Sequence, residues 1–132
     1  MVQATLLLLV LSLALGAHGL PEEKCSNLTG EWKNDLGSNM TISVDEEGNF
    51  TGLYNTAVAS ATNPIQTSPL RGSQHLQDKT TFGFTVNWTF SDSTTVFTGQ
   101  CFMDKGGNEV LKTMWLLRSH VEDIENDWKA TR

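Results

Sequence analysis

Apolar and polar residues alternate along most of this chain, and the alternation is clearest in one aromatic stretch. Every second position from 82 to 90 is apolar: Phe82, Phe84, Val86, Trp88 and Phe90. Successive side chains of a strand point to opposite faces, so these five would share one face of a sheet. One strand of a flat sheet rarely needs so many rings. The stripe therefore indicates either a packed core or the wall of a pocket.

Similar runs, rich in Thr, Val and aromatic residues, recur between short turns. The turns are clusters of Gly, Asn, Asp and Pro at 35–39, 45–49, 62–64, 91–93 and 104–108. The runs lie at about 29–34, 39–45, 49–56, 67–74, 81–90, 93–103 and 109–118. Short strands with tight turns predict an all-β sandwich or an up-and-down barrel, with antiparallel hairpins at 45–49 and 104–108.

The inward faces predicted by this alternation mix large rings with polar groups. Trp32 shares a face with Asn34, and Phe97 shares one with Thr95. A plain core would exclude the polar groups, because each unpaired buried one costs about 1–3 kcal/mol. A pocket whose ligand supplies the missing partners accounts for the mixture. Polar residues at wet strand ends are the alternative that the pattern leaves open.

The last predicted strand, 109–118, has a second apolar face. Met114 and Leu116 are central on the side opposite Trp115. An exposed apolar patch usually marks contact with another protein, so we expect a partner there.

The first nineteen residues are interpreted as a signal peptide, which leaves 20–132 as the mature domain. An almost wholly apolar run, 6–15, precedes small residues at 17–19, where cleavage after Gly19 is expected. The apolar run is too short to span a bilayer, so we expect a secreted, extracellular protein without a membrane anchor. The net charge of −6 on the 132-residue chain argues against nucleic acid as a partner.

If the chain is exported, its cysteines can form a disulfide and its Asn-x-Thr triplets can accept glycans. Cys25 and Cys101 fit one disulfide that ties the first strand to the sixth, with two free buried thiols as the alternative. The triplets begin at Asn27, Asn39, Asn49 and Asn87 and predict a glycoprotein.

Residue patterns for catalysis or metal binding are lacking in the sequence. Only His75 and His120 lie outside the signal, and no Ser-His-Asp, Cys-His or metal-ligand spacing is present. The acidic run 122–127 suggests cation binding, but a solvated turn or a single helical turn is the favoured interpretation. We therefore expect neither an enzyme, nor a metal site, nor a cofactor.

Four longer segments resemble the avidin family of biotin-binding proteins. They are LTGEWKNDLGSNMTI (28–42), GNFTGLYNTAV (48–58), TTFGFTVNWTFSDSTTVFTGQCF (80–102), and EVLKTMWLLRS followed by DWKATR (109–119 and 127–132). The resemblance runs from Lys24 to Arg132. It implies an up-and-down antiparallel β-barrel, eight-stranded in the family, that binds biotin non-covalently at one open end and assembles as a homotetramer.

Matched by position, the resemblance also implies roles for individual residues. The ureido oxygen would meet Asn34, Ser38 and Tyr54, a ureido nitrogen Thr56, and the thioether sulfur Thr95. The rings expected around the ligand are Trp88, Phe90, Phe97 and Trp115. Groups near the carboxylate would be Ser91 and Ser93, with Ser60 as a substitute, and the expected contacts are completed by Leu36, Val58 and Leu117. Trp128 would close the site of a neighbouring subunit.

The chain departs from the family pattern at three points. Ala59 and Ala61 replace hydroxyl-bearing threonines near the carboxylate, the charge is acidic where avidin is basic, and the chain stops before the last strand of the family. We therefore expect a C-terminally truncated barrel. The alternative function is a barrel with weakened or lost biotin binding, which carries another small ligand or serves as a structural extracellular glycoprotein.

The family pattern also ranks the glycosylation triplets. Asn39 is expected to be the best acceptor, because its triplet matches that of the family and follows an exposed turn, with Asn27 and Asn49 as further candidates. Asn87 is expected to be the worst, because it lies in a strand whose outer face would meet a partner subunit.

Overall fold

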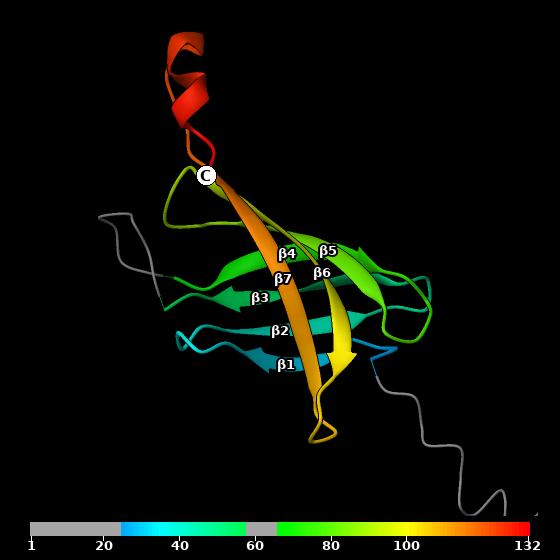
Figure 1. The fold of residues 1–132 in the computed structure, drawn as a ribbon. Coiled ribbons are helices and arrows are strands. Elements are labelled where there is room, and N and C mark those ends of the chain that lie inside the picture. Colours follow the sequence, from blue (N-terminus) through cyan, green and yellow to red (C-terminus); the bar gives the residue numbers. More distant parts are fainter. Residues whose placement is uncertain (1–24, 58–65) are drawn as a thin grey trace, which may run out of the picture.

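The computed structural model of the chain describes residues 25–57 and 66–132, and its strands form one antiparallel sheet (Figure 1). The strands are β1 (Gly30–Lys33), β2 (Asn39–Val44), β3 (Asn49–Asn55), β4 (Ser68–Gln74), β5 (Thr81–Asn87), β6 (Thr94–Met103) and β7 (Glu109–Arg118). Their order in the sheet is their order in the sequence. The predicted all-β, up-and-down fold is thereby confirmed. The predicted signal peptide and the turn at 62–64 lie outside the described residues.

The sheet curls into a half-barrel, so that strands separated by others in the sheet face one another across its interior. Phe50 on β3 and Phe84 on β5 meet edge to face at 6.1 Å between ring centroids, although β4 lies between their strands. Within the described ranges β1 and β7 are not paired with each other, and the half-barrel is open along that flank.

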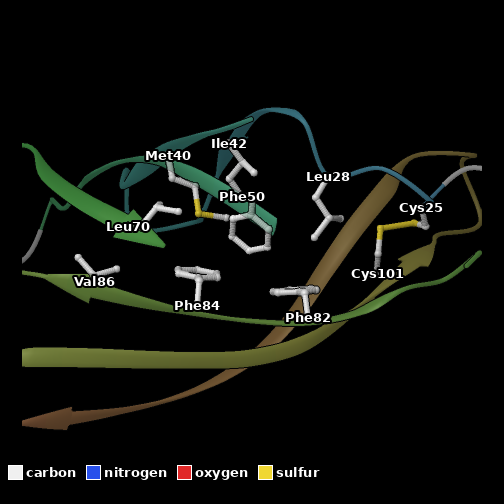
Figure 2. Packing of buried hydrophobic residues seen from close by; sticks show 10 residues of the cluster. All are labelled: Cys25, Leu28, Met40, Ile42, Phe50, Leu70, Phe82, Phe84, Val86 and Cys101. Atoms are coloured by element: carbon white, nitrogen blue, oxygen red, sulfur yellow. A yellow bond between two sulfur atoms is a disulfide. The ribbon is translucent and has the colours of Figure 1, made fainter. Parts of the chain in front are cut away.

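The lower part of the aromatic stripe fills the interior, as expected. Figure 2 shows Phe82, Phe84 and Val86 of β5 pointing toward apolar side chains from the opposite wall. That wall supplies Met40, Ile42, Phe50 and Leu70, and all these side chains are buried. Each buried ring removes about 150–250 Å² from water, which makes this cluster the main apolar contribution to stability.

One strand ends earlier than the alternation predicts. The run expected at 81–90 is a strand only as far as Asn87. Beyond it, the Thr89 backbone N–H donates to the Ser68 side-chain oxygen at 3.0 Å. A side chain has taken the place of a strand partner, so the ladder stops. Trp88 and Phe90 therefore follow β5 and are not part of it.

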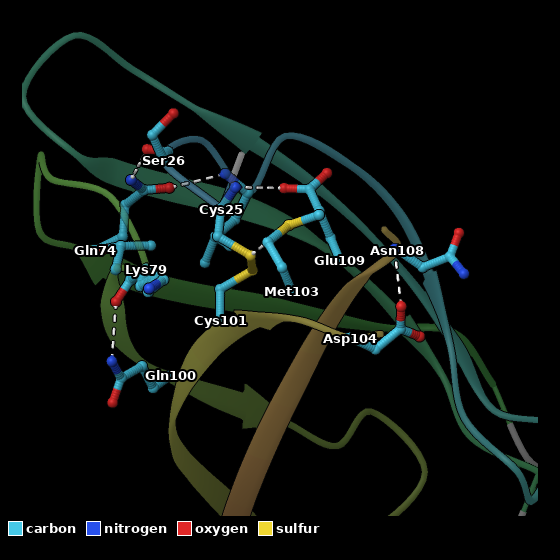
Figure 3. The surroundings of a disulfide bond; sticks show 12 residues. Cys25, Ser26, Gln74, Lys79, Gln100, Cys101, Met103, Asp104, Asn108 and Glu109 are labelled. Atoms are coloured by element: carbon cyan, nitrogen blue, oxygen red, sulfur yellow. Dashed lines mark hydrogen bonds between the residues drawn. A yellow bond between two sulfur atoms is a disulfide. The ribbon is translucent and has the colours of Figure 1, made fainter. Parts of the chain in front are cut away.

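The predicted disulfide is present, but it does not start in the first strand. Cys25 lies in the segment before β1 and is bonded to Cys101 on β6, with their Cα atoms 5.3 Å apart (Figure 3). The backbone N–H of Cys25 also donates to a carboxylate oxygen of Glu109 at 2.7 Å. The bond therefore fastens the N-terminal segment to the far side of the sheet.

The outer face of β7 is apolar and exposed, as expected. Met114 is 79% exposed and Leu116 is 54% exposed. After β7 a short 3₁₀ helix, η1 (Ile124–Lys129), projects from the sheet (Figure 1). In the described part of the chain, no helix has both the length and the apolar character that crossing a membrane requires.

We expect the double substitution Cys25→Ala and Cys101→Ala to lower the free energy of unfolding by about 4 kcal/mol. The disulfide joins residues 76 apart, and its removal frees the unfolded chain by about that amount in the chain-entropy model. Urea denaturation of the variant and the native chain measures the difference. Two alkylatable thiols in the folded native chain would contradict the structure directly.

Candidate functional site

A cavity of about 770 Å³ lies inside the half-barrel, toward the end where β1 runs into β2 and β5 into β6. Its volume is within the usual range for small-molecule sites, about 300–1,000 Å³. The predicted ligand-contact residues that line it are Asn34, Leu36, Ser38, Tyr54, Thr56, Trp88, Phe90, Ser91, Ser93, Thr95, Phe97, Trp115 and Leu117. Residues from four separate stretches of the sequence are thus brought to one concave surface.

Aromatic rings form a continuous wall of this cavity. Tyr54 meets Trp88 edge to face at 5.5 Å and stacks on Phe97 at 5.6 Å. Phe97 in turn stacks on Phe84 at 4.6 Å, and Trp88 contacts Phe90 at 5.6 Å. Rings held by other rings keep their orientation without a ligand, so the apolar surface is already in place.

The turn between β1 and β2 holds one polar side chain rigidly at the cavity. The Oδ1 atom of Asn34 accepts the backbone N–H groups of Leu36 at 3.0 Å and Ser38 at 2.9 Å. Gly37 allows this compact turn because its φ is +89°, in the region that favours glycine. The side-chain carbonyl of Asn34 is thus committed to the turn.

Ser38 and Tyr54 lie beside this turn. Ser38 is buried, and its hydroxyl oxygen accepts the backbone N–H of Ala57 at 2.9 Å. Burial raises the pKa of the Tyr54 phenol above its usual value, while a hydrogen bond with the Ser38 side chain opposes part of that rise. The phenol therefore stays protonated and neutral at physiological pH and keeps a proton to donate.

β6 and the turn before it contribute further hydroxyl groups to the cavity. The indole nitrogen of Trp88 donates to the hydroxyl oxygen of Thr95 at 2.8 Å, which positions the ring and leaves the threonine proton available. The side chains of Ser91 and Ser93 hydrogen-bond to each other in the turn between β5 and β6. The cavity therefore combines an apolar wall with hydroxyl and amide groups at its rim, and it suits a ligand that is part apolar and part polar.

Three predicted ligand-contact residues are not in this lining. Val58 and Ser60 lie outside the described residues, as do Ala59 and Ala61. Trp128 is on η1, does not line the cavity and is 81% exposed. The acidic run around it is structural: Asp123 caps η1, and Asp127 pairs with Arg118 at 2.7 Å.

Other lining residues were not among the predicted contacts. Leu111 and Thr113 line the cavity and share the inward face of β7 with Trp115, so period-2 alternation contained a signal for them. Arg132 also lines it, because the end of the chain returns to pair with β7: its backbone N–H donates to the carbonyl of Leu117 at 3.0 Å. The alternation of apolar and polar residues did not predict this pairing of the chain end with β7.

Comparison with known proteins gives one consistent result. The model of the avidin family matches residues 22–132. Avidin from Gallus gallus is 66% identical, and the match covers 100% of this chain and 91% of avidin. Avidin-related protein 4/5 from the same organism is 64% identical, with 96% of this chain and 85% of that protein covered.

Solved structures agree with the sequence relatives. The crystal structure of Xenavidin superposes with a TM-score of 0.80 at 54% identity, over 83% of this chain and 92% of that one. The X-ray structure of a biotin binding protein from chicken gives a TM-score of 0.79 at 53% identity, with the same shares covered.

The bond between Trp88 and Thr95 can be tested on its own. Thr95→Val keeps the shape of the side chain but leaves the indole N–H without its acceptor, which should lower the free energy of unfolding by about 1 kcal/mol. The control is Thr98→Val, on the exposed face of the same strand, where a change below about 0.5 kcal/mol is expected. Equal losses in urea denaturation would show that the hydrogen bond contributes nothing.

Proposed function

The chain belongs to the avidin family, and we propose that it is a secreted glycoprotein that binds biotin non-covalently in the cavity of its half-barrel. Members of this family are binding proteins and not enzymes, in line with the expectation from the sequence. The observation that carries the proposal is the pairing of a preformed aromatic wall with a cluster of donors from Asn34, Ser38 and Tyr54.

Biotin has the chemistry that this cavity accommodates. Its ureido carbonyl can accept several hydrogen bonds, and the donor cluster offers an amide, a hydroxyl and a neutral phenol on one side of the cavity. Its ring system and aliphatic chain present apolar surface, and the wall of Tyr54, Trp88 and Phe97 would bury it. In such a site the donors stabilise the charge that builds on the carbonyl oxygen, and no nucleophile is needed.

We further propose that the chain acts as a homotetramer in which Trp128 covers the cavity of a neighbouring subunit. Two exposed apolar features support this: Trp128 on η1, and Met114 with Leu116 on β7. Each exposes large side chains that a soluble chain normally covers.

Glycan attachment is proposed at Asn39, Asn27 and Asn49. Asn27 and Asn49 are exposed at the end of the sheet away from the cavity, whereas Asn39 is half-buried and borders the cavity. A glycan on Asn39 would therefore have to leave along the rim. Peptide mass spectrometry of the secreted chain, before and after enzymatic removal of N-glycans, measures the occupancy of each triplet.

Binding itself is tested by titrating the purified secreted chain with labelled biotin. We expect saturable binding at one site per chain and a change in tryptophan fluorescence, because Trp88 and Trp115 line the cavity. Excess free biotin should displace the label. No saturable binding and unchanged fluorescence would refute the proposed function and leave the fold assignment intact.

The role of Trp128 is tested by comparing two exposed residues of one helix. Trp128→Ala should weaken biotin binding by about 30-fold, the usual effect of truncating an aromatic contact worth about 2 kcal/mol. Ile124→Ala is the matched control, since Ile124 is 84% exposed on the same helix. Sedimentation analysis reports assembly in parallel. Equal effects of the two substitutions on affinity would contradict the sharing of Trp128.

A further inference from the structure

A carboxylate lies against the disulfide, where the N-terminal segment is fastened to the sheet. One carboxylate oxygen of Glu109 accepts the backbone N–H of Cys25 at 2.7 Å (Figure 3). The sulfur atoms of Cys25 and Cys101 and one oxygen of Glu109 all lie within 4.8 Å of one another. Glu109 pairs with no lysine or arginine in the described part of the chain. Two sulfur atoms and a carboxylate without a cation are therefore held in one small space.

These three residues come from three different parts of the fold. Cys25 precedes β1, Cys101 is on β6, and Glu109 begins β7. The two cysteines are 76 positions apart, so the sequence contains none of the short ligand spacings that are typical of zinc sites. Only the folded chain brings the three side chains together.

The position of Cys25 does not depend on the disulfide alone. Its carbonyl accepts the backbone N–H of Thr80 at 3.0 Å. Three positions further along the chain, the backbone N–H of Leu28 donates to the buried side chain of Gln74 at 2.9 Å, and Leu28 is itself fully buried. These contacts involve no sulfur atom, so they continue to hold Cys25 close to Cys101 when the S–S bond is broken.

We propose that this cluster, once reduced, binds a zinc ion through the thiolates of Cys25 and Cys101 and a carboxylate oxygen of Glu109. A dithiol reductant supplies the two electrons: it converts the S–S bond into two thiols and is itself oxidised to a cyclic disulfide. Zinc then displaces the two thiol protons to solvent and forms one bond to each sulfur. The ion takes the place of the covalent link between the N-terminal segment and β6, and it adds β7 to that link.

The donor set and its charge favour zinc. Thiolates and carboxylates are ordinary zinc ligands, at about 2.3 Å and about 2.0–2.2 Å from the ion, so the ligand atoms of a tetrahedral site are about 3.3–3.8 Å apart. The sulfur atoms can separate to that distance after reduction, and the carboxylate has to approach by about 1 Å. Two thiolates balance the charge of the ion, which makes it tolerable beside Cys25 and Cys101, both at most 1% exposed.

The open flank of the half-barrel gives the ion a route from solvent. Glu109 is exposed and lines a hollow there together with residues of β1. The fourth position of the zinc ion is thus left to water, as in zinc sites with three protein ligands. Glu31 lines the same hollow but is not part of the cluster, so it provides a matched control.

The experiment starts by reducing the secreted chain with a trialkylphosphine, which has no thiol that could compete for zinc and is oxidised to its oxide with the oxygen of water. Excess phosphine is removed without air, and zinc is titrated against a chromophoric chelator. We expect one zinc ion per reduced chain and none on the oxidised chain. At free zinc one hundred times the dissociation constant, the thermal midpoint of the reduced chain should rise by about 10 °C.

Two carboxylate variants decide whether the folded cluster is the site. Glu109→Gln keeps an oxygen that can accept the Cys25 N–H but loses the negative ligand, so zinc affinity should fall roughly 10-fold or more. Glu31→Gln, in the same hollow, should keep the native affinity. In the oxidised state, both variants should keep the thermal midpoint within about 4 °C of the native chain.

Several results would overturn the inference. A reduced chain that binds no zinc would show that Glu109 serves only to fix the backbone of Cys25. Equal affinities of the native chain and Glu109→Gln would show that the two cysteines bind the ion alone, as in an unfolded chain. Equal binding by the oxidised and reduced chains would place the zinc elsewhere. If reduction unfolds the chain, zinc must restore its native tryptophan fluorescence, and failure to do so would also overturn the inference.

Discussion

The curl of the sheet depends on how the segment before β1 is fastened across the end of the half-barrel away from the cavity. The buried side chain of Gln74 accepts the Leu28 N–H at 2.9 Å and donates to the Ser26 carbonyl at 2.8 Å (Figure 3). The Cys25 carbonyl accepts the Thr80 N–H at 3.0 Å, and the disulfide continues the connection to β6. A meander alone specifies only which strands are neighbours. These ties join the segment before β1 to β4, to the start of β5 and to β6, and so they bring the two walls together over Leu28.

Close approach of the walls also requires small residues beneath the rings. A Cβ atom on Gly72 would lie 2.5 Å from the Cβ of Phe84 and 2.7 Å from Cζ of Phe50, which are impossible contacts. Because that position is bare, the two rings can meet edge to face within the interior. The core around Phe50 and Phe84 is then tightly packed. From Phe84 the layer of rings continues into the cavity wall through the stacked rings of Phe97 and Tyr54. The core and the cavity are thus two parts of one aromatic layer.

The sequence predicted the strands better than the site. Alternation located all seven described strands, because side-chain period is a local property of the chain, and it failed at Trp88, where the Ser68 hydroxyl ends the ladder. The set of ligand contacts came from resemblance, since alternation could not say that Ser38 would meet Ala57 or that Trp88 would meet Thr95. Those contacts depend on the curl. The return of Arg132 to β7 had no local signal for the same reason.

Preorganisation explains why the polar groups of the cavity already have protein partners. The oxygen atoms of Asn34, Ser38 and Thr95 each accept a hydrogen bond from the protein, which fixes the orientation of these side chains beside the cavity. An acceptor bound there would meet donors that have already lost their rotational freedom, so little ordering entropy is left to oppose binding. Because the same bonds stabilise the turn and the strand ends, the donors stay oriented whether or not the cavity is filled. Orientation of the site is therefore a consequence of folding.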